Sequence, residues 1–368
     1  MKPRVQKLFA QFDPKPEAIL VANSIDPHLD QTFFYLFDVP AGLFEGSIAI
    51  AHPDGELDVF SSPLEAETAF EAAKHDPHVK VHVAGRDEIG PAARKLLGPR
   101  TNLGLNYREL THEWFLRLDQ SFSGAKWMDC SNGIRKARVT KDANEIDLLR
   151  HAAEIGSKVG REIPGVLRAG MTELELAAEM EHRMGLHGAS GRSFATIVAF
   201  GPHSAEPHYA PAETKLKAGD SIVCDFGAYY HRYASDITRS FHFGRRDDEM
   251  KKVHETVLKA QEAALAAVKP GVPSKEVHLA ALRVIDASPW KGRLTHGVGH
   301  SIGLVVHDGW AYGPTAEDPL EVGMAITVEP GIYLPGHGGV RIEDDIVVTK
   351  NGYEFLTTAP REYVEVPA

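Results

Sequence analysis

The chain has 368 residues, of which 43% are hydrophobic and 25% are charged, which is typical of folded globular proteins. Its formal net charge of −11 argues against nucleic acid as a main partner, because phosphate binding needs a basic protein surface. The longest apolar runs have only the length of strands, so no membrane-spanning segment is expected, and the chain is long enough for two domains.

The first part of the chain, residues 1–136, is predicted to form an α/β domain because strand-like and helical segments alternate along it. An Asp-Gly pair at residues 54–55, between two strand-like runs, predicts a hairpin. The strands are expected at residues 18–24, 47–53, 56–62, 79–85 and 102–106, and the helices at residues 63–75, 87–98 and 109–118.

A domain boundary is predicted after residue 136. Residues 130–133, with the sequence CSNG, are interpreted as a connection. A long helix is expected to begin near Thr140, because Ile146 and Leu149 recur on one helical face. Residues 137–368 would then form the second domain.

The second domain contains an internal repeat whose copies lie about a hundred residues apart. LKAGDSIVCDFGAYY (216–230) aligns with LEVGMAITVEPGIYL (320–334), which places Asp225 opposite Glu329. The segments YASDITR and GVRIEDD then place Asp236 opposite Glu343. Two copies that each present two acids predict two half-sites meeting at one pseudo-symmetric centre.

These four carboxylates predict a metal centre, because acids gathered in one place repel one another unless cations lie among them. The spacing of Asp225 and Asp236 suits one antiparallel hairpin, and that of Glu329 and Glu343 suits a second. Cys224 precedes Asp225 and is expected to face the opposite side of the strand as a small core residue.

Histidines supply the remaining candidates. The segment THGVGHSIGLVVHDG (295–309) contains His296, His300 and His307, and its glycines favour a strand or loop over a helix. His208 lies just before the first hairpin. An oxygen-rich set with one imidazole suits two divalent ions such as Mn²⁺, Co²⁺ or Zn²⁺, which can activate water and polarise a carbonyl, so metal-assisted hydrolysis is the expected chemistry.

The motifs DFGAYYHRYASDITR, THGVGHSIGLVVHD, VEPGIY and VRIEDD resemble, in this order, those of the pita-bread metallopeptidases, above all Xaa-Pro dipeptidase (prolidase) and aminopeptidase P. The resemblance implies an α+β pita-bread catalytic domain with a pseudo-two-fold repeat, and residues 1–136 fit the creatinase-like α/β domain of these enzymes by length and order. It implies two metal ions per subunit, with Mn²⁺ the first choice. The implied metal ligands are Asp225, Asp236, His300, Glu329 and Glu343.

The same resemblance implies roles for the side chains around the metals and a homodimeric assembly. Glu329 would act as general base, and Arg341 would support the site. The implied substrate-binding residues are His208, His296, His307 and Tyr333, of which His208 and His307 would also stabilise the tetrahedral intermediate.

The expected reaction is hydrolysis of the Xaa-Pro bond in short peptides, most readily in dipeptides. The alternatives are aminopeptidase P, which acts on longer peptides, methionine aminopeptidase, and a pita-bread protein that only binds partners. A dipeptidase must capture the proline carboxylate, for which His28 is one candidate. Arg232, where many relatives have Gly, and Asp308, where Glu is common, depart from the family pattern outside the ligand set.

Two observations indicate the cellular compartment. The first residues, MKPRVQKLFAQFDPKPEA, contain neither the apolar core nor the cleavage site of a secretion signal. Two cysteines, Cys130 and Cys224, are too few for a disulfide framework. A cytoplasmic protein with reduced thiols is therefore expected.

Overall fold

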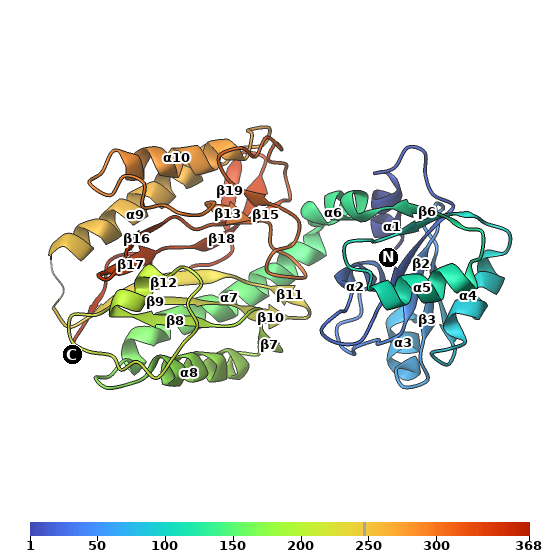
Figure 1. Ribbon diagram of the computed structural model, residues 1–368, viewed down its shortest axis with the longest axis horizontal. Helices are drawn as coiled ribbons and strands as arrows, with labels where there is room; N and C mark the ends of the chain where they lie inside the picture. The colour runs from blue at the N-terminus through green and yellow to red at the C-terminus, as the bar shows by residue number, and fades with distance from the viewer. Residues whose placement is uncertain (246–247) are drawn as a thin grey trace. The chain divides into compact units, whose positions relative to one another are not determined.

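The computed structural model describes residues 1–245 and 248–368, and the chain divides into two compact units (Figure 1). We call residues 1–138 the N-terminal unit and residues 139–368 the C-terminal unit. Each unit has buried hydrophobic clusters of its own. In the parts of the chain that the structure describes, no helix is both long enough and apolar enough to cross a bilayer.

The N-terminal unit is built on one six-stranded mixed sheet with the strand order β4-β3-β2-β1-β5-β6. Its strands are β1 (Ala18–Ala22), β2 (Ile48–Ala51), β3 (Leu57–Ser61), β4 (Val79–Val83), β5 (Asn102–Leu105) and β6 (Lys126–Asp129). Its helices are α1 (Lys2–Phe9), α2 (Gln31–Phe37), α3 (Ala66–Ala73), α4 (Ile89–Leu97), α5 (His112–Ser121) and α6 (Ser131–Val139).

All five strands and all three helices predicted for this part of the chain are present. The fully buried central strand β1 pairs antiparallel with β2 and parallel with β5. Gly55 has a φ of 96°, a left-handed conformation that glycine adopts without a Cβ clash, in the predicted turn between β2 and β3.

The connection predicted at residues 130–133 is wrong, because α6 begins at Ser131. Gly133 is helical and lies against Phe12, whose ring would be 2.2 Å from a Cβ atom at this position. The glycine is therefore explained by close packing of the helix against an aromatic ring, and not by a turn.

Two histidines bind one buried carboxylate on the N-terminal sheet. His52 Nε2 lies 2.8 Å from Asp58 Oδ2, and His82 Nε2 lies 2.6 Å from Asp58 Oδ1. Burial alone would raise the pKa of Asp58, but the hydrogen bonds from the two imidazoles outweigh it and lower the pKa. The ionised form of Asp58 is therefore favoured by folding.

Asp58→Asn is expected to lower the unfolding free energy by about 1–3 kcal/mol at pH 7, because hydrogen bonds to a charged group are lost. A lowered folded-state pKa stabilises above the unfolded value of about 3.9 and loses that effect as the pH falls through the folded value. Urea midpoints of the two proteins should therefore converge between pH 7 and about pH 3. Asp54→Asn, at the exposed turn of the same hairpin, is the control, and a difference independent of pH would contradict the assignment.

In its described residues, the C-terminal unit contains four long helices and a set of short sheets, which are antiparallel except for the parallel pair of β12 and β20. The helices are α7 (Ala143–Val166), α8 (Glu173–Leu186), α9 (Asp248–Ala267) and α10 (Lys275–Asp286), with a 3-10 turn η1 (Gly201–Ala205). The strands are β7 (Gly191–Arg192), β8 (Ile197–Phe200), β9 (Ser221–Phe226), β10 (Ala228–Tyr230), β11 (Tyr233–Ala234), β12 (Ile237–Phe243), β13 (Gly299–His300), β14 (Ala311–Tyr312), β15 (Ala325–Val328), β16 (Gly331–Leu334), β17 (Gly338–Arg341), β18 (Asp344–Thr349), β19 (Gly352–Phe355) and β20 (Glu365–Val366).

The two halves of this unit repeat one plan, in which two helices precede a pair of nested hairpins. In the first half β9 pairs with β12 and β10 with β11, and in the second half β15 pairs with β18 and β16 with β17. Figure 1 shows α8 on one side of these strands and α9 with α10 on the other. Both predicted hairpins are present.

The helix starts of the first half agree with the sequence. The long helix predicted to begin near Thr140 is α7, and Asp142 caps its N-terminus in a capping box with Glu145. A capping box of Thr172 and Glu175 begins α8, where each side chain bonds the other residue's backbone N–H. These caps fix where each helix starts and therefore how its apolar face meets the strands.

Candidate metal centre

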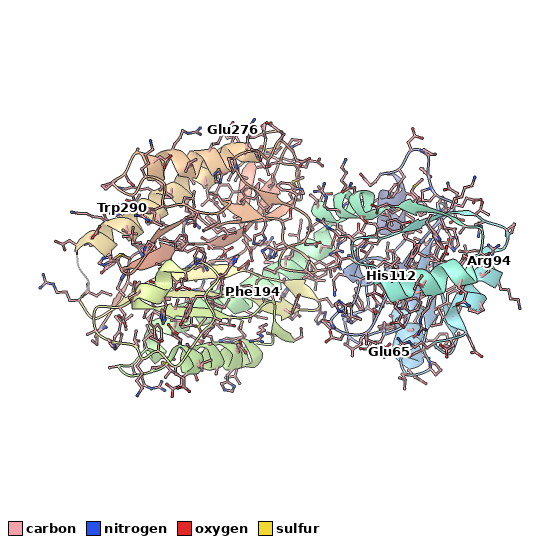
Figure 2. All side chains as sticks on the ribbon, viewed as in Figure 1. Glu65, Arg94, His112, Phe194, Glu276 and Trp290 are labelled. Carbon is pink, nitrogen blue, oxygen red and sulfur yellow. The ribbon has the colours of Figure 1, made fainter. Side chains whose placement is uncertain are left out.

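A cavity of about 320 Å³ lies within the C-terminal unit, and all five predicted metal ligands line it. Four further predicted site residues line it as well, namely His208, His296, His307 and Arg341. One part of the lining is apolar and includes Phe194 (labelled in Figure 2), Ile197 and Val306. The cavity lining therefore combines charged and apolar side chains.

The nested hairpins explain how the four acids come to face one cavity. In the β9–β12 pair Asp225 lies opposite Thr238, and Asp236 precedes Thr238 by two residues. Residues two apart on a strand face the same side, so Asp225 and Asp236 share one face. In the second half Glu329 directly follows β15, and Glu343 directly precedes β18. Each half thus places its two acids where the outer and inner hairpins meet.

His300 completes the group of candidate ligands. Atoms of Asp236, His300 and Glu343 able to bind a metal all lie within 4.8 Å of one another. The Nε2 atom of His300 lies 3.5 Å from Asp236 Oδ2 and 3.6 Å from Glu329 Oε1. Its Nδ1 atom donates to the carbonyl of Ser301 at 3.2 Å, which leaves the Nε2 lone pair directed at the acids.

The donor set fits divalent metal ions. Among the described residues, four buried carboxylate oxygens have no hydrogen-bond partner. Three belong to acids that line the cavity, namely Asp225 Oδ1, Asp236 Oδ1 and Glu343 Oε1, and the fourth is Asp345 Oδ1. Burial, and after it the charges of neighbouring carboxylates, raises the pKa values of Asp236, Glu329 and Glu343. Cations among these oxygens would supply the missing partners and offset the repulsion.

Arg341 is the cation that the chain itself places beside the acids. Its side chain is 4% exposed, and Nη2 donates to Asp225 Oδ2 at 2.6 Å. Its Nε donates to Thr238 Oγ1 at 3.1 Å, and the Thr238 hydroxyl donates to Glu343 Oε2 at 2.6 Å. Arg341 therefore contacts Asp225 of the first half directly and Glu343 of the second half through Thr238.

A chain of hydrogen bonds runs from Arg341 to His296. Nη1 of Arg341 donates to the Tyr333 hydroxyl at 3.0 Å, which lies 2.9 Å from His296 Nε2. Burial, helped by the charge of Arg341, lowers the pKa of His296 to about 4, so the ring is neutral at pH 7. Its Nδ1 donates to the carbonyl of Gly297 at 2.7 Å, and its Nε2 consequently accepts from Tyr333.

Tyr333 itself is not among the residues that line the cavity. Its side chain is 3% exposed, and burial raises its pKa to about 12. The predicted substrate-binding role of Tyr333 would therefore be exerted through His296 and Arg341, which do line the cavity. His208 and His307 are exposed at the cavity, and the His307 ring centroid is 4.3 Å from that of His300.

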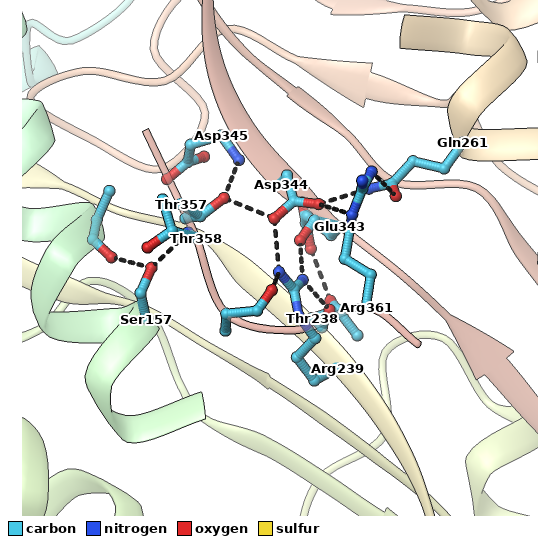
Figure 3. A network of polar contacts seen from close by, with 12 residues as sticks. Ser157, Thr238, Arg239, Gln261, Glu343, Asp344, Asp345, Thr357, Thr358 and Arg361 are labelled. Atoms are coloured by element: carbon cyan, nitrogen blue, oxygen red, sulfur yellow. Dashed lines mark hydrogen bonds and ion pairs between the residues drawn. The ribbon is translucent and has the colours of Figure 1, made fainter. Parts of the chain in front are cut away.

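A second layer of polar groups lies behind the acids, and sequence reasoning missed it. Arg239 donates to the carbonyl of Glu343 at 2.6 Å and to Asp344 Oδ1 at 2.6 Å (Figure 3). Asp345 Oδ2 accepts from the backbone N–H of Asp236 at 2.8 Å. Arg239 lies in the motif SDITR, and Asp344 and Asp345 lie in the motif EDD. The motifs alone do not show which side chains face the cavity, whereas the alternation of side chains along the strand places Arg239 on the opposite face.

Two other expectations concern residues outside the cavity lining. Cys224 is fully buried, as expected for a core residue, and burial raises its thiol pKa. His28 is exposed in the loop between β1 and α2 of the N-terminal unit, so its role in binding a carboxylate stays a prediction.

Comparison with known proteins adds independent findings. The model of metallopeptidase family M24 matches residues 147–350. An uncharacterized peptidase of Bacillus subtilis is 36% identical over 262 residues, 71% of this chain and 74% of the relative. The Xaa-Pro dipeptidase from Bacillus anthracis superposes with a TM-score of 0.88 at 31% identity, covering 99% of both chains. The X-Pro aminopeptidase from Thermotoga maritima gives 0.89 at 33% identity, covering 99% of this chain and 100% of the other. The predicted fold class, a creatinase-like α/β domain followed by a pita-bread domain, is confirmed.

Proposed function

The chain belongs to metallopeptidase family M24, and from this premise we propose that it is an Xaa-Pro dipeptidase, which hydrolyses the bond before proline in short peptides. The observation that carries the proposal is the buried group of four carboxylates and His300 in one cavity. The Bacillus anthracis structure, described as an Xaa-Pro dipeptidase, supports the choice of substrate.

We propose that this cavity holds two divalent ions, with Mn²⁺ the first choice and Co²⁺ or Zn²⁺ as alternatives. Asp225, Asp236, His300, Glu329 and Glu343, which all line the cavity, would hold the ions. When bound, the ions would activate a water at neutral pH and polarise the scissile carbonyl. The unpartnered carboxylate oxygens and the outward Nε2 of His300 support this ligand set.

The remaining side chains would handle protons and charge. Glu329 is the proposed general base, and its carboxylate lines the cavity 3.6 Å from Nε2 of His300. His208 and His307, exposed at the cavity, would donate hydrogen bonds to the developing oxyanion. Arg341 would keep Asp225 in place through their 2.6 Å contact.

The apolar side chains that line the cavity suit a substrate with proline. The Xaa-Pro bond is a tertiary amide without an N–H group, so peptidases that need that hydrogen as a donor act on it poorly. Phe194, Ile197 and Val306 offer apolar surface to a pyrrolidine ring. By the family resemblance we also propose a homodimer in the cytoplasm.

A second candidate is aminopeptidase P activity on longer peptides. The similarity to the Thermotoga maritima X-Pro aminopeptidase, at a TM-score of 0.89, favours it. The two activities share the metal chemistry and differ in whether the protein must bind the carboxylate of the proline or leave room for further residues.

The test is product release by the Mn²⁺-loaded protein from an Xaa-Pro dipeptide and from the matching Xaa-Pro-Yaa tripeptide. Cleavage confined to the dipeptide is expected. Preference for the tripeptide would assign aminopeptidase P, and a Met-Ala-Yaa peptide serves as the control for methionine aminopeptidase. Inactivity on both proline peptides with metal bound would overturn the proposal.

A further inference from the structure

A buried carboxylate outside the metal centre lies behind the segment that carries His208. Glu173 is the first residue of α8, and its side chain is 0% exposed. Carboxylates are seldom fully buried unless hydrogen bonds or counter-charges satisfy them. The proposed chemistry does not use Glu173, so its burial calls for another explanation.

Four donors satisfy this carboxylate, two on each oxygen. Oε1 accepts from the backbone N–H of Phe200 at 2.9 Å and from His203 Nδ1 at 3.1 Å. Oε2 accepts from the hydroxyl of Tyr209 at 3.0 Å and from the backbone N–H of Ala212 at 3.0 Å. A carboxylate has about four acceptor sites, so the match between donors and acceptors is complete.

All four donors belong to residues 200–212, which we call the His208 segment. The rings of His203 and Tyr209 stack on each other with centroids 4.5 Å apart. Both ends of the segment are thus fixed to one side chain, and the residues between them reach the cavity.

Pro207 and His208 lie between these anchors, and both line the cavity. The carbonyl of Pro207 accepts from Arg341 Nη1 at 3.4 Å, and Ser204 Oγ accepts from the backbone N–H of Gly339 at 2.8 Å. The His208 side chain itself is exposed. Its location depends on the backbone that Glu173 holds.

We propose that Glu173 is a positioning residue that fixes the His208 imidazole over the metal centre. The inference rests on the proposed peptidase function, in which His208 binds the reacting carbonyl. Glu173→Gln replaces one carboxylate oxygen, which accepts two hydrogen bonds, with an NH₂ group that cannot accept any. The variant therefore loses two of the four hydrogen bonds that hold the His208 segment. A displacement of about 1 Å at a reacting group can cost about 100-fold in rate.

The test compares kcat/KM for an Xaa-Pro peptide in four proteins: wild type, E173Q, H208A and the double variant. E173Q is expected to lower kcat/KM about 10- to 100-fold in the wild-type background and less than about 2-fold in the H208A background. Mn²⁺ affinity by calorimetry should stay unchanged. An equal loss in both backgrounds, or a loss of metal affinity, would overturn the proposal.

Glu175→Gln is the matched control, because Glu175 lies in the same helical turn and caps α8 without contacting the His208 segment. It should leave kcat/KM within about 2-fold of wild type. If E173Q does not fold, Tyr209→Phe removes one of the four donors and should give a smaller loss that again depends on His208.

A readout independent of activity separates this proposal from the proposed function. Hydrogen exchange of residues 200–212 should become faster in E173Q and remain unchanged in E175Q. Unchanged exchange in E173Q would contradict the positioning role. If the wild-type enzyme cleaves no Xaa-Pro peptide, the peptidase proposal fails, while the exchange data still decide whether Glu173 holds the segment.

Discussion

Glu343→Gln is expected to abolish Mn²⁺-dependent cleavage of an Xaa-Pro peptide and, at the same time, to raise the melting temperature of the metal-free protein. Burial and three neighbouring carboxylates raise the pKa of Glu343, which means that its charge is unfavourable when no cation is present. Glutamine removes that charge and still accepts the hydrogen bond from Thr238. The apo protein should therefore gain stability.

The same change removes one of the five proposed metal ligands. If the metal ions no longer stabilise the transition state by several kcal/mol, the rate should fall at least ~10³-fold. Wild type with metal at about 100 times its Kd should gain about 2.7 kcal/mol. For a unit of this size that is a rise in Tm of about 5–10 °C, and the variant should show none of it.

Two melting curves and one activity assay check this prediction. Each protein is melted after treatment with a chelator and again with Mn²⁺, and peptide cleavage is measured at saturating Mn²⁺. Glu354→Gln is the control, because Glu354 is 53% exposed and its pair with Arg150 lies on the surface. A variant that keeps a metal-induced rise in Tm, or that loses stability without metal, would contradict the repulsion argument.

The acids of the metal centre could be predicted from the sequence because the chain repeats them. Asp225 and Glu329, and then Asp236 and Glu343, occupy matching positions in two copies of one template. Strands that end on a carboxylate next to apolar residues also leave a local pattern with a period of two. Five strands of the N-terminal sheet, β1 to β5, were predictable as short strand-like runs that alternate with helical segments.

Elements without such a pattern were not predicted. Six of the seven residues of α2 are buried, so this helix is apolar on all sides and shows no amphipathic period. The strand β6 has no buried residue, so its sequence alternation gives no sign of a core face. The Arg239–Asp344 pair joins residues 105 positions apart, and no local motif encodes such a contact. Glu173 was missed because the hydrogen-bond partners of its side chain lie 27 to 39 residues away.

Arg239→Met is expected to cause the largest loss of stability, about 3–5 kcal/mol, because it leaves the Asp344 carboxylate buried without its cation. Arg239 is 2% exposed and Asp344 is 1% exposed, so water cannot replace the lost contact. The guanidinium also donates to the carbonyls of Thr238, Glu343 and Ala359. It thereby joins the first half of the unit to the second half and to the C-terminal segment.

Because Thr238 and Glu343 belong to different halves, loss of this guanidinium should weaken metal binding as well as folding (Figure 3). Urea unfolding of the chelator-treated protein measures the first effect, and Mn²⁺ titration by calorimetry measures the second, expected as a 10- to 100-fold rise in Kd. Arg361→Met is the control, since Arg361 is 26% exposed and its Nε is 4.0 Å from Asp344. It should cost less than about 1 kcal/mol. If Arg239→Met lost stability but kept wild-type Mn²⁺ affinity, the two half-sites would be held in register by their nested hairpins, and Arg239 would serve folding alone.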